Sequence, residues 1–275
     1  MNLRALLELC RISNLPTVWS NVALGLAIGT VLSEARSNRS SIYSFPLVDI
    51  LLSDPLYVVF TSGFLLGISL IYCSGMVLND FADRNVDAIE RPTRPIPSGR
   101  ITARQALGIT IVMLIAGFVI SGGWLVALIS SSNQSNGLWI QNALLLSALI
   151  ACVVLYNYIH QAKAASVFLM GMCRSLAFLT PALFMHGWPI TPEYSLFIIG
   201  PAVTLFLYTL AISIVARREM ETKRFAGPKT IMNMIAAMPL LDAIWLIVMG
   251  LWPVSLFCVA CAGLTKLAHR KVAGS

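Results

Sequence analysis

The chain has 275 residues, of which 57% are hydrophobic and only 11% are charged, and its formal net charge is +7. A soluble domain would carry about a quarter charged residues. This composition, with a mean hydropathy of +0.80, therefore excludes an ordinary soluble protein and indicates a polytopic membrane protein. The six cysteines lie within or next to apolar runs, a placement that favours packing over a disulfide framework.

Apolar runs long enough to cross a bilayer, about 20 residues each, recur along the chain. The first run is longer than the hydrophobic part of a typical signal peptide, about 7–15 residues, and is expected to stay as a span. Together the runs predict an all-α polytopic transmembrane helix bundle of about eight spans, forming one integral-membrane domain over residues 1–275. The predicted spans are residues 15–32, 56–79, 104–125, 139–159, 165–185, 194–216, 230–249 and 251–268.

The positions of the basic residues predict how the bundle is oriented. With eight spans and a cytoplasmic N-terminus, the outer side keeps only Arg36 and Arg39, and Arg174 lies within a span. The other 16 of the 19 Lys and Arg residues then face the cytoplasm, as the positive-inside rule requires. Both termini are therefore predicted to be cytoplasmic, and the basic excess reflects orientation in the bilayer rather than a nucleic-acid partner.

Three aspartates follow the second predicted span, and they face the cytoplasm in this orientation. Asp80, Asp83 and Asp87 are spaced i, i+3 and i+7. If the helix continues through them, 3.6 residues per turn places all three carboxylates on one face. Like charges stacked in this way repel one another, unless a cation binds them. Mg²⁺ prefers such carboxylate oxygens together with water and phosphate oxygens, so the row predicts a magnesium site.

The loop after the aspartates is rich in arginine and proline. Arg91, Arg94 and Arg100 follow within a short stretch, and their guanidinium groups are suited to phosphate. The acidic row and the basic loop lie together at the membrane edge, and this combination predicts a magnesium–diphosphate site. The alternative is a solvated charged cap on a membrane helix.

The segment from Asn79 to Arg100 carries a resemblance to a known family. Asn-Asp-x-x-Asp-x-x-x-Asp followed by Arg-Pro-Thr-Arg-Pro-Ile-Pro-Ser-Gly-Arg resembles the first aspartate motif and loop of the UbiA superfamily of intramembrane prenyltransferases. The resemblance implies Mg²⁺-dependent transfer of a prenyl group from an isoprenoid diphosphate to a small aromatic or lipidic acceptor, with Asn79 helping to hold the diphosphate. The superfamily usually has nine spans, so either the last is missing here or residues 104–130 contain an extra one.

Two polar residues lie within predicted spans. Asn21 matches a residue of the superfamily, and Arg174 is a charge that needs a partner. Asn21 matches an Asn of the superfamily's first helix that faces the cavity near the diphosphate, but it could instead bridge neighbouring helices. Arg174 lies in an otherwise apolar run. Because a guanidinium inside a bilayer costs at least a few kcal/mol, it should pair with a diphosphate, with Asp83 or Glu219, or with Asp242, the other lone charge in a span.

The resemblance also implies a diphosphate contact from a lysine at the start of the fifth span. Lys163 follows Tyr158 at this place, and His160 is a competing candidate. The positive-inside rule alone would also place a lysine here, so an anchoring role stays open for Lys163.

The second acidic motif departs from the superfamily pattern, which has several aspartates after a Tyr. Here Tyr208 is followed by Arg217 where an Asp is expected, and then by Glu219 and Glu221. The resemblance implies that Glu219 either binds metal or pairs with an arginine of the first loop. The aromatic residues Trp19, Tyr72, Phe81 and Tyr208 could face the allylic cation, and of these Tyr208 is the one predicted to do so. This form of the motif, together with Met-Cys-Arg-Ser around Arg174, resembles the EboC-like branch.

The eroded second motif leaves other functions open. A catalytically weakened relative would bind or move an isoprenoid or pigment precursor without turnover. A transporter would show internal repeats and sites near the bilayer midplane, whereas the acidic residues here cluster at one face. The expected partners are an isoprenoid diphosphate, a small acceptor and the lipid bilayer.

Overall fold

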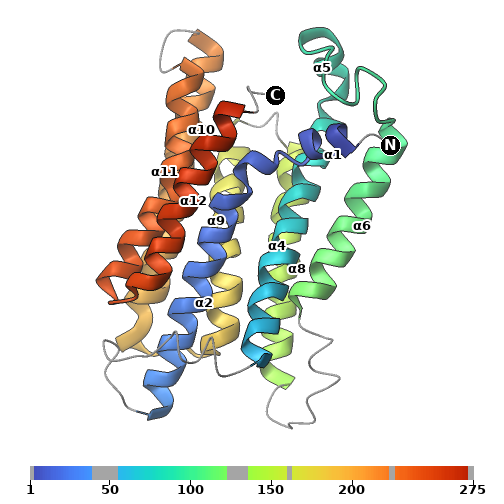
Figure 1. Cartoon of the computed structure of the whole chain (residues 1–275). Helices are drawn as coiled ribbons and strands as arrows, with labels where there is room; N and C mark the ends of the chain where they lie inside the picture. Colours follow the sequence, from blue (N-terminus) through green and yellow to red (C-terminus); the bar gives the residue numbers. More distant parts are fainter. Residues whose placement is uncertain (1–2, 39–54, 123–135, 160–162, 223–226, 272–275) are drawn as a thin grey trace.

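The computed structural model describes residues 3–38, 55–122, 136–159, 163–222 and 227–271, and helices dominate it (Figure 1). Eight of the described helices have 19 residues or more and run side by side, which confirms the predicted all-α bundle. Each contains most of one predicted span. They are α2 (Leu15–Asn38), α4 (Pro55–Ala82), α6 (Ala103–Ser121), α8 (Asn136–Ile159), α9 (Lys163–His186), α10 (Ser195–Thr222), α11 (Gly227–Val248) and α12 (Trp252–Lys271).

Seven of the described helices are long and apolar enough to cross a membrane, from the segment Ile12–Arg36 to the segment Lys229–Val248. The chain is therefore a multi-pass integral membrane protein. The last predicted span forms α12, which packs along α11 and α2. It is not among the seven, and its last turns carry Lys266, Arg270 and Lys271. In the region of the suspected extra span, α6 ends at Ser121, and residues 123–135 lie outside the described part.

The two described ends of the chain lie at the same end of the bundle. The short helix α1 (Leu3–Leu9) and the last turn of α12 both lie at the end that carries α5 (Arg84–Glu90) (Figure 1). This arrangement requires an even number of crossings. Which face of the membrane this end occupies remains a prediction from the Lys and Arg distribution.

Reporter fusions in a bacterial host test this orientation. We expect alkaline phosphatase fused after Ser275 to be inactive and green fluorescent protein at the same point to fluoresce, because the positive-inside rule places this end in the cytoplasm. Phosphatase inserted within residues 39–54 should be active. An active phosphatase at Ser275 would show that the bundle is inserted the other way round.

Close approach of α2 and α9 depends on two glycines one turn apart. A Cβ at Gly25 would overlap the carbonyl oxygen of Phe178, and a Cβ at Gly29 would overlap that of Ala182. Small residues four apart are a common way for membrane helices to bring their backbones together. Because the next turn towards α5 carries Asn21 on α2, this packing also sets the spacing between the polar residues of the two helices.

Candidate active site

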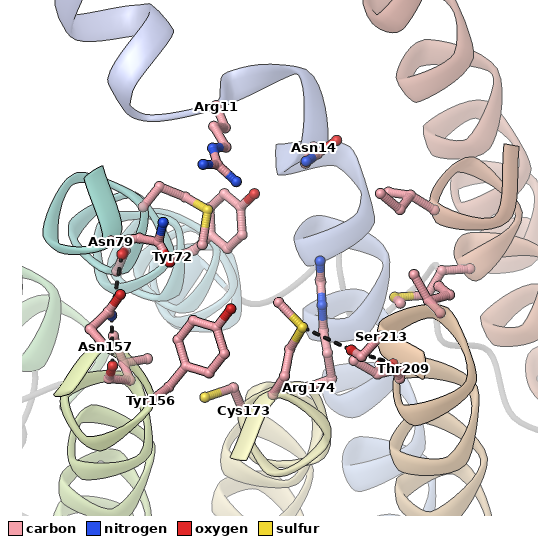
Figure 2. A pocket seen from close by; sticks show the side chains of 17 residues that line it. Arg11, Asn14, Tyr72, Asn79, Tyr156, Asn157, Cys173, Arg174, Thr209 and Ser213 are labelled. Atoms are coloured by element: carbon pink, nitrogen blue, oxygen red, sulfur yellow. Dashed lines mark hydrogen bonds between the residues drawn. The ribbon is translucent and has the colours of Figure 1, made fainter. Parts of the chain in front are cut away.

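A cavity of about 220 Å³ lies among α4, α8, α9, α10 and α11, near the end of the bundle that carries α5 (Figure 2). The segment before α2 also reaches it. Most of its wall is apolar, and the charged lining groups are the guanidinium groups of Arg11 and Arg174. None of the described residues that line the cavity is acidic. The cavity is therefore positively charged.

Two of the three aspartates that were predicted to bind metal meet at one point. Arg94 Nη1 donates to Asp87 Oδ2 at 2.7 Å and to Asp80 Oδ1 at 3.3 Å, and all three residues are buried. Asp83 instead accepts a hydrogen bond from Asn79 Nδ2 at 3.0 Å. Asp80 and Asp87, which lie two turns apart, therefore share one helical face, as the spacing predicts.

The backbone between α4 and α5 explains why these acids keep their spacing. The helix is interrupted at Asp83, yet the backbone N–H of Asp83 bonds to the Asn79 carbonyl oxygen and that of Asp87 bonds to the Asp83 carbonyl oxygen, both at 2.9 Å. The chain thus continues with helical spacing through the break. The return to α6 is fixed by a capping box between Thr102 and Gln105, whose reciprocal hydrogen bonds define where the helix begins.

The acidic pair lies directly behind the cavity wall. Arg11 lines the cavity and donates through Nη2 to Asp80 Oδ1 at 3.1 Å. Asn79, which bonds to Asp83, lines it as well. Arg11 and Asn79 therefore connect the aspartates to the cavity wall, and Arg11 and Arg94 balance the charges of Asp80 and Asp87.

Mg²⁺ suits the donor chemistry of Asp80 and Asp87. Among the residues that the structure describes, no group of three or more His, Cys, Asp or Glu side chains could hold a metal ion. The two carboxylates nevertheless converge on a cation, because the Arg94 guanidinium stands where an ion would sit. If Arg94 moves aside, two carboxylate oxygens supplemented by water and phosphate oxygens are what Mg²⁺ commonly accepts.

The other two loop arginines lie apart from this pair. Arg100 donates to both carboxylate oxygens of Glu8, at 2.8 and 3.2 Å, and these hydrogen bonds raise its pKa above the ordinary value. Arg91 is exposed at the end of α5. Of the three predicted phosphate-binding arginines in the loop, only Arg94 forms an ion pair with the acidic row among the side chains that the structure describes.

Arg174 is linked to Asp242, one of its expected partners, through a chain of hydrogen bonds. Its Nη2 donates to Thr17 Oγ1 at 3.0 Å and its Nη1 to Asn21 Oδ1 at 3.2 Å. Asn21 Nδ2 in turn donates to Asp242 Oδ2 at 2.8 Å. Asn21 thus bridges helices, one of the two roles expected for it, and the two lone charges of the spans are joined through it.

The remaining predicted residues lie outside the cavity lining or outside the described part. Tyr208 donates its hydroxyl to the Met234 carbonyl oxygen at 2.9 Å, between α10 and α11. Glu219 is half-buried near the end of α10, and Arg217, which stands where the superfamily has an Asp, bonds to Ser166. Lys163 begins α9, but its side chain, like all of His160, is not among those described.

Sequence reasoning missed Arg11 and Asn14 as site residues. Both line the cavity beside Tyr72, and Asn14 Oδ1 is held 2.6 Å from His269 Nε2 of α12. The sequence could have indicated both as site residues, because they lie three residues apart just before the first span, on the side predicted to carry the acidic row. Tyr156 and Asn157 of α8 were missed as well, because nothing in an apolar helix marks which residues face inward.

Comparison with known proteins decides the family. Residues 50–269 match the UbiA prenyltransferase family. The chain belongs to this family. Over 59 residues it is 44% identical to a 4-hydroxybenzoate octaprenyltransferase of Vibrio parahaemolyticus, covering 21% of each chain. Over 53 residues it is 51% identical to a digeranylgeranylglyceryl phosphate synthase of Methanothrix thermoacetophila, covering 19% of this chain and 20% of the relative.

Longer matches to UbiA-family proteins are weaker in identity. A digeranylgeranylglyceryl phosphate synthase of Methanosphaera stadtmanae is 28% identical over 143 residues, which is 52% of this chain and 45% of the relative. The matches thus span about a fifth to a half of these curated relatives. A solved structure from work on digeranylgeranylglyceryl phosphate synthase in membranes superposes with a TM-score of 0.50 at 19% identity, covering 98% of this chain and 95% of that one. At this identity the likeness shows a shared fold.

The placement of Tyr208 in this UbiA-family chain leads to a test of its predicted role. Because its hydroxyl bonds to the Met234 carbonyl oxygen and does not line the cavity, we expect Tyr208→Phe to change kcat by less than about threefold. Loss of the hydrogen bond should cost roughly 1 kcal/mol of stability. Steady-state kinetics and thermal unfolding in detergent measure the two effects. A kcat reduced a hundredfold with unchanged unfolding temperature would instead support a direct role in catalysis.

Proposed function

We propose that this protein transfers a prenyl group from an isoprenoid diphosphate to a small aromatic or lipidic acceptor within the membrane, with Mg²⁺ bound by Asp80 and Asp87. The observation that carries the proposal is the cationic cavity with a convergent carboxylate pair directly behind its wall. Its matched relatives are named for prenyl transfer to 4-hydroxybenzoate and for digeranylgeranylglyceryl phosphate synthesis. We further propose that the active-site end of the bundle faces the cytoplasm.

The cationic groups of the cavity would stabilise the leaving diphosphate. Mg²⁺, when bound, supplies Lewis-acid stabilisation of the phosphate oxygens. Arg11 and Arg174 direct their guanidinium groups into the cavity from the segment before α2 and from α9 (Figure 2). Preorganised donors of this kind stabilise negative charge that develops as the allylic C–O bond breaks. Asn79 would help to orient the diphosphate, and Lys163 and Glu219 stay proposed as further diphosphate and metal ligands.

The apolar part of the wall would protect the reactive carbocation. Met76, Met170, Ile212 and Met238 line the cavity, and exclusion of water by such side chains prevents hydrolysis of a reactive intermediate. The ring of Tyr156, which also lines the cavity, is suited to stabilise an allylic cation through its π face. The cavity volume of about 220 Å³ is below the roughly 300–1,000 Å³ of most small-molecule sites, so a long prenyl chain would extend out between helices.

Turnover with a defined acceptor panel tests this proposal. Purified protein in lipid nanodiscs is incubated with radiolabelled geranylgeranyl diphosphate, Mg²⁺ and either 4-hydroxybenzoate or geranylgeranylglyceryl phosphate. We expect a prenylated product with at least one acceptor and none after addition of EDTA. Saturable Mg²⁺-dependent binding without product from any acceptor would favour the alternative function, binding or moving an isoprenoid. That alternative is motivated by Arg217, which replaces an acid of the second motif and bonds to Ser166.

A further inference from the structure

We infer that a second pocket, between the ends of α4 and α8, binds one anionic phospholipid of the bilayer, with Arg84 receiving the lipid phosphate. The pocket has a volume of about 240 Å³. Among the described lining residues, only Asn157 is shared with the central cavity. The inference therefore goes beyond the proposed function, and its test needs no turnover. The pocket is lined by Leu78, Phe81, Ala82, Arg84, Asn157 and Tyr158.

The pocket lies at the edge of the membrane. The apolar spans of α4 and α8 end at Ala82 and Ile159, so Phe81 and Tyr158 each stand one residue before the end of a span. Tyrosines at this depth are typical of the interface between lipid and water. Arg84 follows two residues after the span of α4 ends, and an arginine there can extend its guanidinium group to the headgroups. The pocket is thus at the level of the lipid phosphates.

The charge of Arg84 is available to an external anion. Arg84 is the one charged residue among the described lining residues, and it takes part in none of the ion pairs between described side chains. The neighbouring acids have other partners, because Asp83 accepts from Asn79 and Asp87 pairs with Arg94. A phosphate in the pocket would therefore meet an arginine that no carboxylate neutralises.

Arg84 is also held in place before a ligand binds. Its Nη1 donates to the Phe81 carbonyl oxygen at 2.8 Å, which uses one of the five N–H donors of a guanidinium group. The guanidinium carbon lies 4.5 Å from the centre of the Phe81 ring, within the range of a cation–π contact. Because the side chain is already fixed, little rotamer freedom is lost when it binds a phosphate.

Apolar side chains beside the pocket favour a lipid over a free phosphate. Tyr158 is 75% exposed, and Leu155, which is 45% exposed, lies one turn deeper on the same face of α8. Leu78 forms a buried apolar part of the pocket wall. These side chains can contact the glycerol backbone and the acyl chains of a lipid, whereas an inorganic anion would leave them without a partner.

The predicted orientation of the bundle agrees with an anionic lipid. The pocket lies at the end of the bundle that carries α5, which the Lys and Arg distribution places in the cytoplasm. Anionic lipids give the cytoplasmic leaflet its negative surface potential, and basic pockets between membrane helices on this side bind their headgroups. We therefore assign the pocket to a phospholipid of the bilayer.

Native mass spectrometry of the full chain in detergent tests this inference. Phosphatidylglycerol, which is anionic, and phosphatidylcholine, which is zwitterionic, are each titrated with the same acyl chains. We expect one phosphatidylglycerol to bind severalfold more tightly than phosphatidylcholine. Arg84→Gln should weaken phosphatidylglycerol binding about fivefold or more, the size expected for loss of one basic residue at the membrane surface, and should abolish the preference between the two lipids.

Matched variants separate this pocket from general charge effects. Arg91→Gln removes an exposed arginine at the other end of α5 and should leave lipid binding unchanged. Tyr158→Ala should weaken binding severalfold without changing the unfolding temperature, because this side chain is mostly exposed. It keeps the test decisive if Arg84→Gln does not fold. Equal weakening by Arg91→Gln and Arg84→Gln, or full binding by Tyr158→Ala, would overturn the inference.

Competition identifies the source of the phosphate. We expect glycerol 1-phosphate to displace phosphatidylglycerol only at a concentration at least about 100-fold higher, because it lacks the acyl chains. Displacement at equal concentrations would mean a site for free phosphate and would overturn the assignment to a lipid. Geranylgeranylglyceryl phosphate that displaces phosphatidylglycerol at tenfold lower concentration would make the pocket a site for the acceptor and would also overturn it.

The outcomes are independent of the proposed function. Lipid binding that depends on Arg84 in a protein that forms no prenylated product would uphold this pocket and disprove prenyl transfer. Prenyl transfer by a protein that binds the two lipids equally would have the opposite meaning.

Discussion

Replacing Asp80 and Asp87 together by asparagine is expected to lower kcat/KM for prenyl transfer by at least about 1,000-fold. The two carboxylates converge on one cation in the structure, and loss of both would remove the proposed Mg²⁺ site. Metal stabilisation of a leaving group is worth several kcal/mol, and each 1.4 kcal/mol corresponds to a factor of ten in rate. Asparagine oxygens can still accept from Arg94, so the fold should persist. Kinetics over a Mg²⁺ titration, with thermal unfolding of each variant, measure the effect.

Two single variants serve as controls for this result. Asp83→Asn alters an acid that bonds to Asn79 instead of joining the pair, and its effect should be smaller than that of the double variant by tenfold or more. Glu90→Gln removes an exposed acid of α5 and should leave activity unchanged. A D80N/D87N protein with the wild-type dependence on Mg²⁺ would show that the metal binds elsewhere.

Substitution of Gly29 by alanine is expected to lower the stability of the helix bundle. A Cβ at this position would overlap the carbonyl oxygen of Ala182 and lie 2.8 Å from the Cβ of Met185. Because backbone atoms of α9 cannot move aside alone, the two helices must separate. Overpacking of this kind costs roughly 1–3 kcal/mol. Separation would also disturb the hydrogen bond between Asn21 and Arg174.

The matched control lies on another helix. Gly108 of α6 has open space where a Cβ would lie, so Gly108→Ala should keep or raise the unfolding temperature, since alanine favours a helix over glycine by about 1 kcal/mol. Thermal unfolding of both variants in one detergent gives the comparison. Equal unfolding temperatures for the two would mean that α2 and α9 tolerate a wider spacing than the structure indicates.

The helices and the acidic motif could be read from the sequence because their signals are local. A run of apolar residues forms a membrane helix whatever its neighbours are, since the bilayer leaves the backbone no other way to satisfy its polar groups. The spacing of Asp80 and Asp87 likewise follows from the helical repeat alone, and the structure brings these two side chains together. The resemblance to the UbiA superfamily rested on the same continuous segment.

The pairing of charges did not follow from the sequence in the same way. Nothing in the sequence indicates that Arg100 bonds to Glu8, 92 residues away. The hydrogen bond from the Tyr208 hydroxyl to the Met234 carbonyl oxygen is equally absent from any local pattern. Each pairing depends on how the helices are rotated about their axes and on how they cross. Hydropathy does not determine the pairing, because many residue types along a helix are compatible with the same hydropathy.

By itself, the sequence determined that the chain is a bundle of membrane helices with an acidic row and a basic loop at one end. Only the tertiary structure decided that arginines neutralise the acids and that Arg11 and Arg174 face the cavity. It also joined Asn21 to Asp242 across 221 residues of sequence. The physical reason is that hydropathy and helical repeat act over one or two turns, whereas a buried charge is paired by whichever polar group the packing of distant helices brings within hydrogen-bonding distance.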